Sequence, residues 1–337
     1  MAPLKVCVIG MGKMGLSHAS ILSTMPEVEL VGCVDPDPAA EKLARSVGAR
    51  APFFRSTALA FERKPAAAFL CVPSRANLSV ARDCVARGAH VFVEKPLAHS
   101  LPAAREMLAL EEGRPDLRFG VGFMGAHIGT FAKARELLAA GAVGRILRAC
   151  CRVEYGLVFS HQEQWLFKKD AAGGGAAMSI GSHAIVQIHR LLGPVSAVES
   201  SVWFFTSGNE VEDSGVAQLR LTSGAEVELH YDWSAANRPQ SMVSLEISGT
   251  AGTLRVSMAW LEVESAGQRT ATHVSELPDP ASVFLGVDGH YSADAEFVRR
   301  CLAGGTPAVS WADAYHVQQV IHAIYDSAQR KTQVALE

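Results

Sequence analysis

The chain has 337 residues, of which 49% are hydrophobic and 19% are charged, and its formal net charge is −3. This composition excludes intrinsic disorder, because the chain can bury a large core, and the length is sufficient for two domains. A near-neutral charge without blocks of one sign gives no indication of a nucleic-acid or membrane-surface partner, and no apolar run approaches the ~20 residues of a membrane span.

The first third of the chain alternates between short apolar strands and helical patterns. Strands are expected at residues 5–9, 29–34, 67–72, 90–93 and 118–123, and helices at 14–23, 38–47, 76–87 and 102–111. Strands that alternate with helices need crossover connections, which produce a parallel sheet covered on both faces. The first domain is therefore expected to be a doubly wound α/β domain.

The pattern changes after Met124. Helices are expected at residues 130–140, 176–192, 293–301 and 312–329, and strands at 146–158, 197–205, 215–221, 226–233, 243–248, 253–256 and 261–264. Consecutive strands joined by short turns are typical of antiparallel pairing. We therefore expect a second α/β domain with an open, mostly antiparallel sheet.

A glycine-rich loop follows the first strand. In the stretch VCVIGMGKMGLSH, residues 6–18, three glycines are spaced G-x-G-x-x-G. Between a strand and a helix, the first permits a tight turn, the second lets the backbone approach a pyrophosphate, and the third lets the helix pack on the strand. This pattern predicts a dinucleotide site, although a plain turn is the alternative. The predicted loop comprises Gly10, Met11, Gly12, Lys13, Met14 and Gly15.

A second signal for the dinucleotide is Asp35, which ends the second strand 20 residues after Gly15. A carboxylate at this place can accept hydrogen bonds from a ribose hydroxyl, whereas the alternative is an aspartate that only caps the next helix. Asp37 adds negative charge, and no Lys or Arg stands between Cys33 and Glu41. The sequence therefore favours NAD over NADP.

The segment AHVFVEKPLA places Glu94, Lys95 and Pro96 just past another buried strand. Open parallel sheets bind ligands at the carboxyl ends of their strands, so Lys95 should face the cofactor crevice. A lysine can donate a proton to a carbonyl, or accept one from an alcohol if its pKa falls well below the usual value. The alternative is a surface lysine paired with Glu94.

Together these motifs resemble the glucose–fructose oxidoreductase/inositol dehydrogenase/MocA (Gfo/Idh/MocA) family, nearly from end to end. The resemblance rests on VIGMGKMG, CVPSRANLSVARDCVARGAHVFVEKPLA, GGGAAMSIGSHAIVQIHRLLG and AEFVRRCLAGGTPAVSWADAYHVQQVIHAIYDSAQR. It implies an NAD-binding Rossmann domain at residues 1–124. It also implies a substrate and oligomerisation α/β domain at 125–337, whose last helix could pack back on the first domain. The implied assembly is a homodimer or homotetramer.

The family's functional residues can be carried over by position. Lys95 matches the catalytic lysine, and His183 matches the active-site histidine. The segment with Val72, Pro73 and Asn77 matches the loop that touches the nicotinamide half, although Asn77 stands where a histidine is common. The expected cofactor-binding residues are those of the glycine loop and Asp35, together with Val72, Pro73, Asn77, Glu94, Lys95 and Pro96.

Several positions depart from the family pattern. Ser179 and Val186 stand where the middle helix usually carries aspartates, and Met124 opens a stretch in which an Asn-Arg-Arg run is common. Ser179 and His183 are four residues apart, so on an α-helix they would share one face, with Ser179 as a hydrogen-bonding partner. Candidate substrate residues, each with plain packing or a plain loop as the alternative, are Met124, His127, Tyr155, His161, Trp165, Ser179 and His183.

The expected activity is that of an NAD(H)-dependent oxidoreductase acting on a secondary alcohol or ketone of a sugar, cyclitol or sugar derivative, with Lys95 as proton donor or acceptor and His183 as an orienting or relaying group. The alternatives are an NAD-binding protein with lost or altered turnover, a transient oxidation that permits elimination, and imine reduction. The expected partner is a small polyol-like substrate. Scattered histidines give no metal-ligand spacing, and seven cysteines without C-x-x-C indicate free thiols in a cytoplasmic protein.

Overall fold

The structure is a computed structural model of the chain, and it describes residues 2–46, 50–159, 165–205, 208–235, 242–277 and 289–336. The chain divides into two units, of which the first contains Met1–Met124 and His290–Tyr315 and the second contains Gly125–Gly289 and His316–Glu337. A single boundary after residue 124 is what the sequence suggests. In the structure, the segment His290–Tyr315 groups with the first unit.

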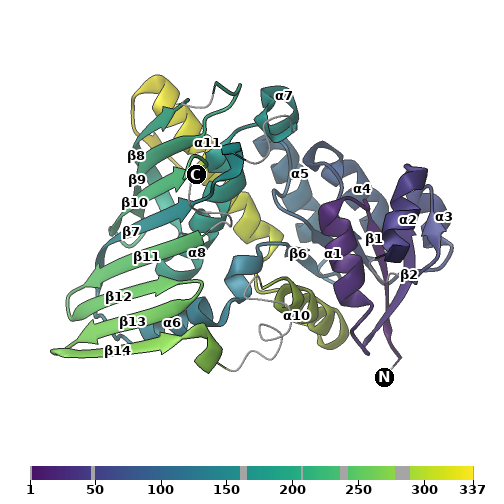
Figure 1. Cartoon of the computed structure of the whole chain (residues 1–337), viewed down its shortest axis with the longest axis horizontal. Coiled ribbons are helices and arrows are strands. Elements are labelled where there is room, and N and C mark those ends of the chain that lie inside the picture. The colour runs from purple at the N-terminus through teal and green to yellow at the C-terminus, as the bar shows by residue number, and fades with distance from the viewer. Residues whose placement is uncertain are drawn as a thin grey trace. The chain divides into compact units, whose positions relative to one another are not determined.

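The first unit is built on a six-stranded sheet with the order β3-β2-β1-β4-β5-β6, of which Figure 1 labels β1, β2 and β6. All five strand pairs are parallel. The strands are β1 (Leu4–Ile9), β2 (Val28–Val34), β3 (Phe53–Phe54), β4 (Ala67–Leu70), β5 (His90–Val93) and β6 (Phe119–Val121). The strand order reverses between β1 and β4, which is the point at which sheets of this kind bind ligands.

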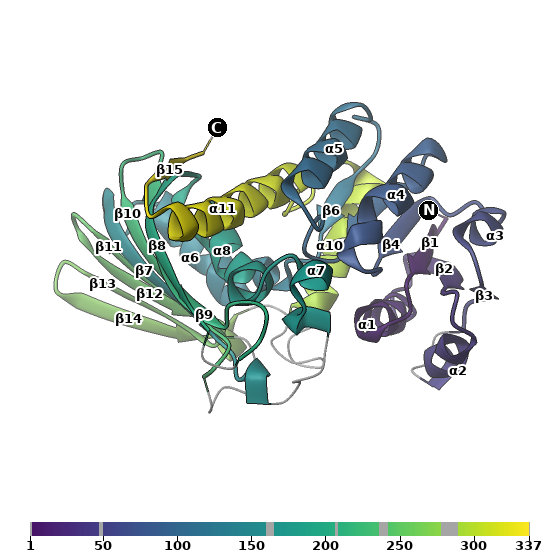
Figure 2. The same cartoon turned by 90° about the horizontal axis from the view of Figure 1, so that it is seen from above.

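Helices cover both faces of this sheet, as expected for crossover connections. Figure 2 shows α4 and α5 on one face and α1 on the other. The rings of Phe69 and Phe92 stack within the core and Phe297 of α10 meets both edge-on, so the late helix α10 shares the core of the early strands. The helices of this unit are α1 (Lys13–Leu22), α2 (Pro38–Ser46), α3 (Thr57–Phe61), α4 (Ser74–Ala86), α5 (Leu101–Glu112) and α10 (His290–Ala303), together with the start of α11 (Trp311–Arg330).

The second unit is built on a nine-stranded sheet with the order β14-β13-β12-β11-β7-β10-β9-β8-β15. The pair β7 and β10 is parallel and the other pairs are antiparallel, so the expected mostly antiparallel sheet is confirmed. The strands are β7 (Ile146–Glu154), β8 (Val195–Phe204), β9 (Ser214–Leu221), β10 (Glu226–Asp232), β11 (Met242–Gly249), β12 (Gly252–Ser257), β13 (Trp260–Ser265), β14 (Gln268–His273) and β15 (Val334–Ala335).

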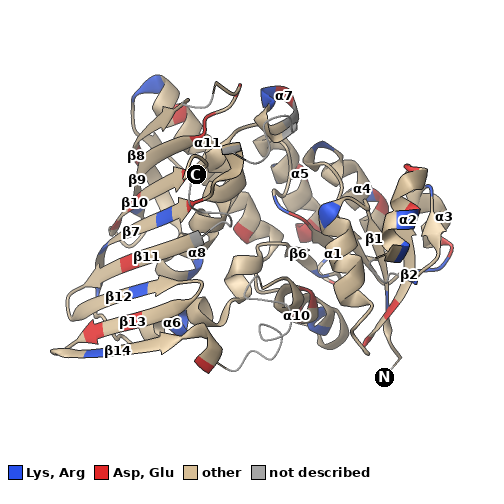
Figure 3. Cartoon of the chain, in the orientation of Figure 1, with Lys and Arg blue, Asp and Glu red and all other residues tan. Residues whose placement is uncertain are grey.

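One face of this sheet is covered by α6 (Gly129–Ala139), α8 (Ser182–Leu192) and the later part of α11 (Figure 2). Side chains alternate along each strand, so Cys151 is buried on the covered face while Cys150 is half-buried on the open face. The open face interleaves cations and anions across β7, β11, β12 and β13 (Figure 3). Arg255, for example, pairs with Glu246 at 2.8 Å and Glu262 at 3.0 Å.

All seven cysteines are free thiols, as expected. None of the helices in the described part of the chain is long and apolar enough to cross a membrane. Some short elements were not predicted, namely β3, α3, β14 and β15. β3 and β15 have two residues each, which is too few for a periodic pattern to register, and β14 has five exposed side chains among its six residues.

The helix expected at residues 176–192 has two parts. It begins as a π-helical turn, η4 (Ala177–Gly181), and continues as α8. Ser179 lies in the π-helical turn and His183 in α8. Residues four apart share one face of a regular α-helix, whereas the structure has a π-helical turn at Ser179, so the expectation that Ser179 and His183 share a face rests on a geometry that is not present there. Short π-helical turns within α-helices often occur at functional sites.

Candidate active site

The glycine loop combines close backbone packing with one open position. Gly10 has φ +89°, and a Cβ there would lie 2.6 Å from the carbonyl oxygen of Cys71. A Cβ on Gly15 would lie 1.8 Å from the carbonyl oxygen of Gly10. A Cβ on Gly12, the N-cap of α1, would meet nothing within 4 Å. The loop therefore packs tightly on the protein while leaving the backbone open at Gly12, as a pyrophosphate site at a helix N-terminus requires.

Asp35 fixes the same loop from β2. Its Oδ2 accepts the N–H of Met11 at 2.8 Å, and its Oδ1 accepts the N–H of Asp37 at 2.9 Å. Each carboxylate oxygen has a further acceptor position, so the side chain can still receive a ribose hydroxyl. Asp35 is half-buried, which leaves part of it accessible to a ligand.

A cation near Asp35 could not be inferred from spacing along the chain. Arg55, which follows β3, donates from Nη1 to the carbonyl oxygen of Pro36 at 3.4 Å. Its guanidinium also lies over the ring of Phe53, 5.6 Å from the ring centroid. The stretch from Cys33 to Glu41 contains no Lys or Arg, but the fold brings one to it because β3 pairs with β2.

Lys95 lies two residues after the end of β5 and is half-buried. Burial lowers the pKa of its amine, and the negative charge of Glu94 opposes that effect. Asn77 of α4 holds the same segment, because its Nδ2 donates to the carbonyl oxygens of Pro96 and Leu97, both at 3.1 Å. Asn77 is buried, and its Oδ1 has no hydrogen-bond partner among the described residues. Asn77 thus positions the Lys95 segment, and its predicted contact with the cofactor stays a prediction.

The carboxylate of Glu94 points into the interior of the first unit. Its Oε1 lies 3.1 Å from His18 Nε2, and its Oε2 accepts the N–H of Lys95 at 3.1 Å. A Cβ on Gly122 would lie 2.3 Å from Oε1, so a glycine is required there to leave room for the carboxylate. The sequence motif singled out Glu94, but it gave no sign of His18 as its partner.

The remaining predicted cofactor residues gather at the same edge of the sheet. Val72 and Pro73 follow β4, and Pro73 is the N-cap of α4. A Cβ on Gly10 would lie 2.9 Å from the backbone nitrogen of Val72, so the glycine loop abuts this segment. The structure therefore brings residues from the ends of β1, β2, β4 and β5 together, as the topology predicts.

In the second unit, Ser179 and His183 lie around the start of α8. His183 is in its first turn and half-buried, and Ser182 Oγ donates to the carbonyl oxygen of Ser179 at 2.9 Å. Val186, which stands where the family has an aspartate, is buried in the core. Tyr155 follows β7 and is half-buried. Met124 and His127 are the ends of the short helix η1 (Met124–His127) and are both half-buried.

The last two predicted substrate residues, His161 and Trp165, follow β7 along the chain. Trp165 begins the short helix η3 (Trp165–Phe167), and His161 lies outside the described residues. Their predicted contacts with substrate stay predictions.

Sequence reasoning missed a buried carboxylate that holds the segment before α8. Glu212 Oε2 accepts the N–H of Gly175 at 3.0 Å, and Oε1 accepts the N–H of Ala177 at 3.0 Å. The hydroxyl of Tyr325 also donates to Oε1 at 2.9 Å. Burial raises the pKa of Glu212, and these hydrogen bonds oppose the rise. Glu212 thus fixes where the π-helical turn begins and, with it, the path toward His183.

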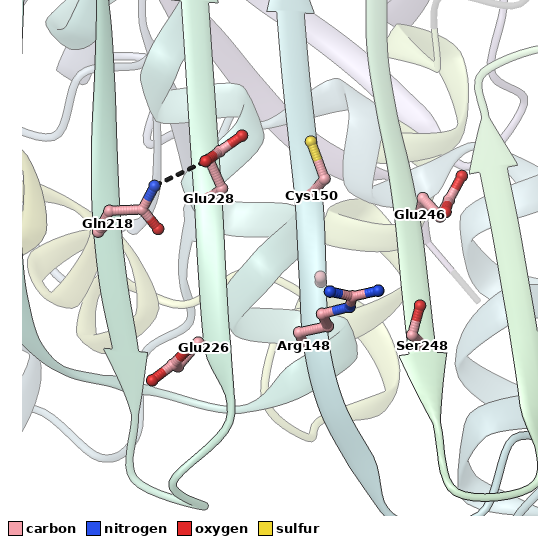
Figure 4. A pocket seen from close by; sticks show the side chains of 8 residues that line it. Arg148, Cys150, Gln218, Glu226, Glu228, Glu246 and Ser248 are labelled. Atoms are coloured by element: carbon pink, nitrogen blue, oxygen red, sulfur yellow. Dashed lines mark hydrogen bonds between the residues drawn. The ribbon is translucent and has the colours of Figure 1, made fainter.

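The open face of the large sheet carries a polar hollow of about 300 Å³ (Figure 4). Within it and beside it, the ligand atoms of Cys150, Glu228 and His230 lie within 4.8 Å of one another. Spacing along the chain could not reveal this group, because its members come from two strands. Glu228 already accepts from Gln218 at 2.7 Å and contacts His230 at 2.6 Å, so we assign no metal to it.

Two models of one protein family match the chain. The NAD-binding Rossmann-fold model of the GFO/IDH/MocA oxidoreductase family matches residues 4–123, and a GFO/IDH/MocA C-terminal domain model matches residues 131–255. The chain belongs to the Gfo/Idh/MocA family. The predicted family is thus confirmed, and residues 4–123 of this Gfo/Idh/MocA protein match the NAD-binding Rossmann fold of an oxidoreductase.

Relatives of the chain are named as sugar oxidoreductases. It is 24% identical to levoglucosan dehydrogenase of Pseudarthrobacter phenanthrenivorans and 24% identical to D-glucoside 3-dehydrogenase of Escherichia coli, over 99% of this chain and 98% of each relative. It is 30% identical to 1,5-anhydro-D-fructose reductase of Ensifer adhaerens over 58% of this chain and 59% of the relative. A solved structure of levoglucosan dehydrogenase with NADH and L-sorbose shares the fold, with a TM-score of 0.90, 22% identity and 99% of each chain covered.

Proposed function

We propose that this protein is an NAD(H)-dependent oxidoreductase that interconverts a secondary alcohol and a ketone on an uncharged sugar, cyclitol or sugar derivative. The observation that carries the proposal is Lys95, a half-buried amine with a lowered pKa, two residues past β5 in the unit that contains the glycine loop. Relatives that match over nearly the whole chain, named as dehydrogenases of levoglucosan and of D-glucosides, support the substrate class.

The residues present would divide the work in a simple way. The loop from Gly10 to Gly15 and Asp35 would hold the dinucleotide, which when bound accepts or supplies a hydride. Lys95 in its neutral form would take the proton from the substrate hydroxyl, and in the reverse direction its ammonium would donate that proton to the carbonyl. The lowered pKa of Lys95 increases the fraction of neutral amine near neutrality. His183 would orient the hydroxyl or relay the proton.

The three residues after Phe123 include no Lys or Arg, which supports an uncharged substrate. The family often has an arginine pair at this place, whereas this chain has Met124, Gly125 and Ala126. A phosphorylated or carboxylated sugar would lose a bidentate partner there. A panel of glycosides, anhydro sugars and cyclitols, followed by NADH absorbance, tests the proposal.

A second candidate is a protein that binds NAD without turnover. It is favoured by Ser179 and by the buried Val186, which leave the middle helix without the family's carboxylates. Bound NAD with no redox change on any member of the panel would support this candidate over the enzyme.

His183→Ala should lower turnover by only about 10-fold, because a serine at 179 provides no negative charge to hold an imidazolium. Ser179→Asp should increase the importance of His183 and shift the pH optimum. The measurement is steady-state turnover of the single and double variants. If the loss on His183→Ala were the same with Ser179 and with aspartate at that position, the two side chains would not act together.

Cofactor choice should depend on Asp35. We expect NAD to bind at least tenfold more tightly than NADP, a difference of ~1.4 kcal/mol, because a 2′-phosphate would meet the Asp35 carboxylate. Asp35→Ser should reduce this difference, since Arg55 would remain to attract the phosphate. Arg55→Ala is the control, which should spare NAD affinity and cancel the gain of Asp35→Ser toward NADP. Calorimetric titration decides, and equal affinities in the wild type would refute the role of Asp35.

A further inference from the structure

Three buried ionisable side chains contact one another in a row next to Lys95 within the first unit. His18 comes from α1, Glu94 follows β5 and Asp294 comes from α10, with exposed fractions of 1%, 9% and 0%. His18 Nδ1 lies 2.9 Å from both carboxylate oxygens of Asp294, and Nε2 lies 3.1 Å from Glu94 Oε1. Glu94 Oε2 in turn accepts the N–H of Lys95.

The imidazole of His18 is charged in this arrangement. Each ring nitrogen faces a carboxylate, which when ionised can only accept, so both nitrogens carry protons. Burial alone would lower the pKa of His18, but the charge and hydrogen bond of Asp294, followed by those of Glu94, raise it to about 10. Without this cation between them, the buried carboxylates of Glu94 and Asp294 would each make ionisation of the other less favourable.

The surroundings add few other charges to this group. The ring of His290, also on α10, lies 6.1 Å from the His18 ring, centroid to centroid. Burial raises the pKa of Asp294, and the charge and hydrogen bond of His18, with a smaller contribution from His290, oppose the rise. Cys71, just past β4, faces the carboxylates, and burial followed by their charges raises the pKa of its thiol. The rings of Phe69 and Phe92 pack on the imidazole of His18, with ring centroids 5.6 and 5.5 Å from its centroid.

We propose that His18, held by Asp294, is a positioning residue that fixes the Glu94 carboxylate and thereby the place and charge environment of Lys95. The proposal rests on the proposed role of Lys95. It gives α1 two tasks, because this helix begins at the glycine loop and carries His18 within its second turn. It also gives α10 a task in the site, since Asp294 is the partner that completes the charge balance from 276 residues away.

The test combines His18→Gln, Asp294→Asn and a matched control. Glu296→Gln is the control, because Glu296 is another buried carboxylate of α10 but pairs with Arg300 and the N–H of Ala308 instead. In His18→Gln, Glu94 loses its cation, so the pKa of Lys95 should rise. The turnover for oxidation increases with pH, and the midpoint of that increase should therefore shift to a pH about one unit higher. At neutral pH the turnover should be roughly 10-fold lower. NAD affinity should change less than about twofold, and Glu296→Gln should leave the pH profile in place.

A readout on the cofactor-free protein accompanies the kinetics. Nitrogen NMR of labelled histidines should show both His18 ring nitrogens protonated well above pH 8, and Asp294→Asn should lower that pKa by at least about one unit. This variant also keeps the proposal testable if His18→Gln does not fold. A neutral His18 ring at pH 7 would overturn the proposal, as would an unchanged pH profile in His18→Gln while Lys95→Ala loses turnover. Retained turnover in Lys95→Ala would instead overturn the proposed function and, with it, the role of His18.

Discussion

Lys95→Ala should lower turnover by at least ~100-fold while leaving the affinity for NAD nearly unchanged. The reason is that the dinucleotide is proposed to bind through the glycine loop and Asp35, whereas the proposed proton transfer depends on the amine of Lys95. Lys95→Met should behave like Lys95→Ala, because it keeps most of the aliphatic stem and removes only the ionisable group. Steady-state turnover and calorimetric NAD titration of both variants provide the measurement.

The direction of the pH effect follows from the lowered pKa of Lys95. Oxidation needs the neutral amine, so its rate should rise with pH and level off below the pH at which an ordinary lysine would do so. Reduction needs the ammonium and should show the opposite trend. Near-normal turnover in Lys95→Ala, with NAD still bound, would assign the proton transfer to His183, to a tyrosine such as Tyr155, or to water.

Gly12→Ala should weaken NAD binding by at least ~100-fold, or ~2.8 kcal/mol, without a comparable loss of stability. In the protein alone its new Cβ meets nothing within 4 Å, so the fold can accept it. The same Cβ would occupy the place at which the pyrophosphate approaches the backbone. Calorimetric titration and thermal unfolding separate the two effects.

Gly15→Ala is the matched comparison, because its Cβ would lie 1.8 Å from a backbone oxygen. This variant should lose stability by about 3 kcal/mol, at the upper end for overpacking, and NAD binding with it. If Gly12→Ala bound NAD as tightly as the wild type, the pyrophosphate would not lie at this loop.

Local patterns predicted the first unit well because its signals are short in range. The glycine loop, Asp35 and the Lys95 segment each sit at the end of a strand, and the parallel topology alone brings strand ends to one edge of the sheet. The partners of these residues depend on tertiary contacts. Arg55 reaches the Asp35 loop through the pairing of β3 with β2, and Asp294 meets His18 only because α10 returns to the first unit.

The second unit was less predictable at its site for a related reason. The sequence pattern indicated one continuous helix at residues 176–192, since apolar periodicity hardly distinguishes a π-helical turn from an α-helical one. What fixes the turn is the buried Glu212, which accepts backbone N–H groups from 35 and 37 residues away. Ser179 and His183 are therefore placed by a contact that no local motif encodes.

The central claim, hydride transfer between NAD and an uncharged sugar, is tested most directly by an absorbance screen. Glycosides, anhydro sugars and cyclitols would be offered with NAD, and the matching keto sugars with NADH, to the wild type and to Lys95→Ala. We expect the wild type to form or consume NADH with at least one member of the panel, and we expect Lys95→Ala, with NAD still bound, to show no such change. A wild type that binds NAD but changes no member in either direction would contradict the claim.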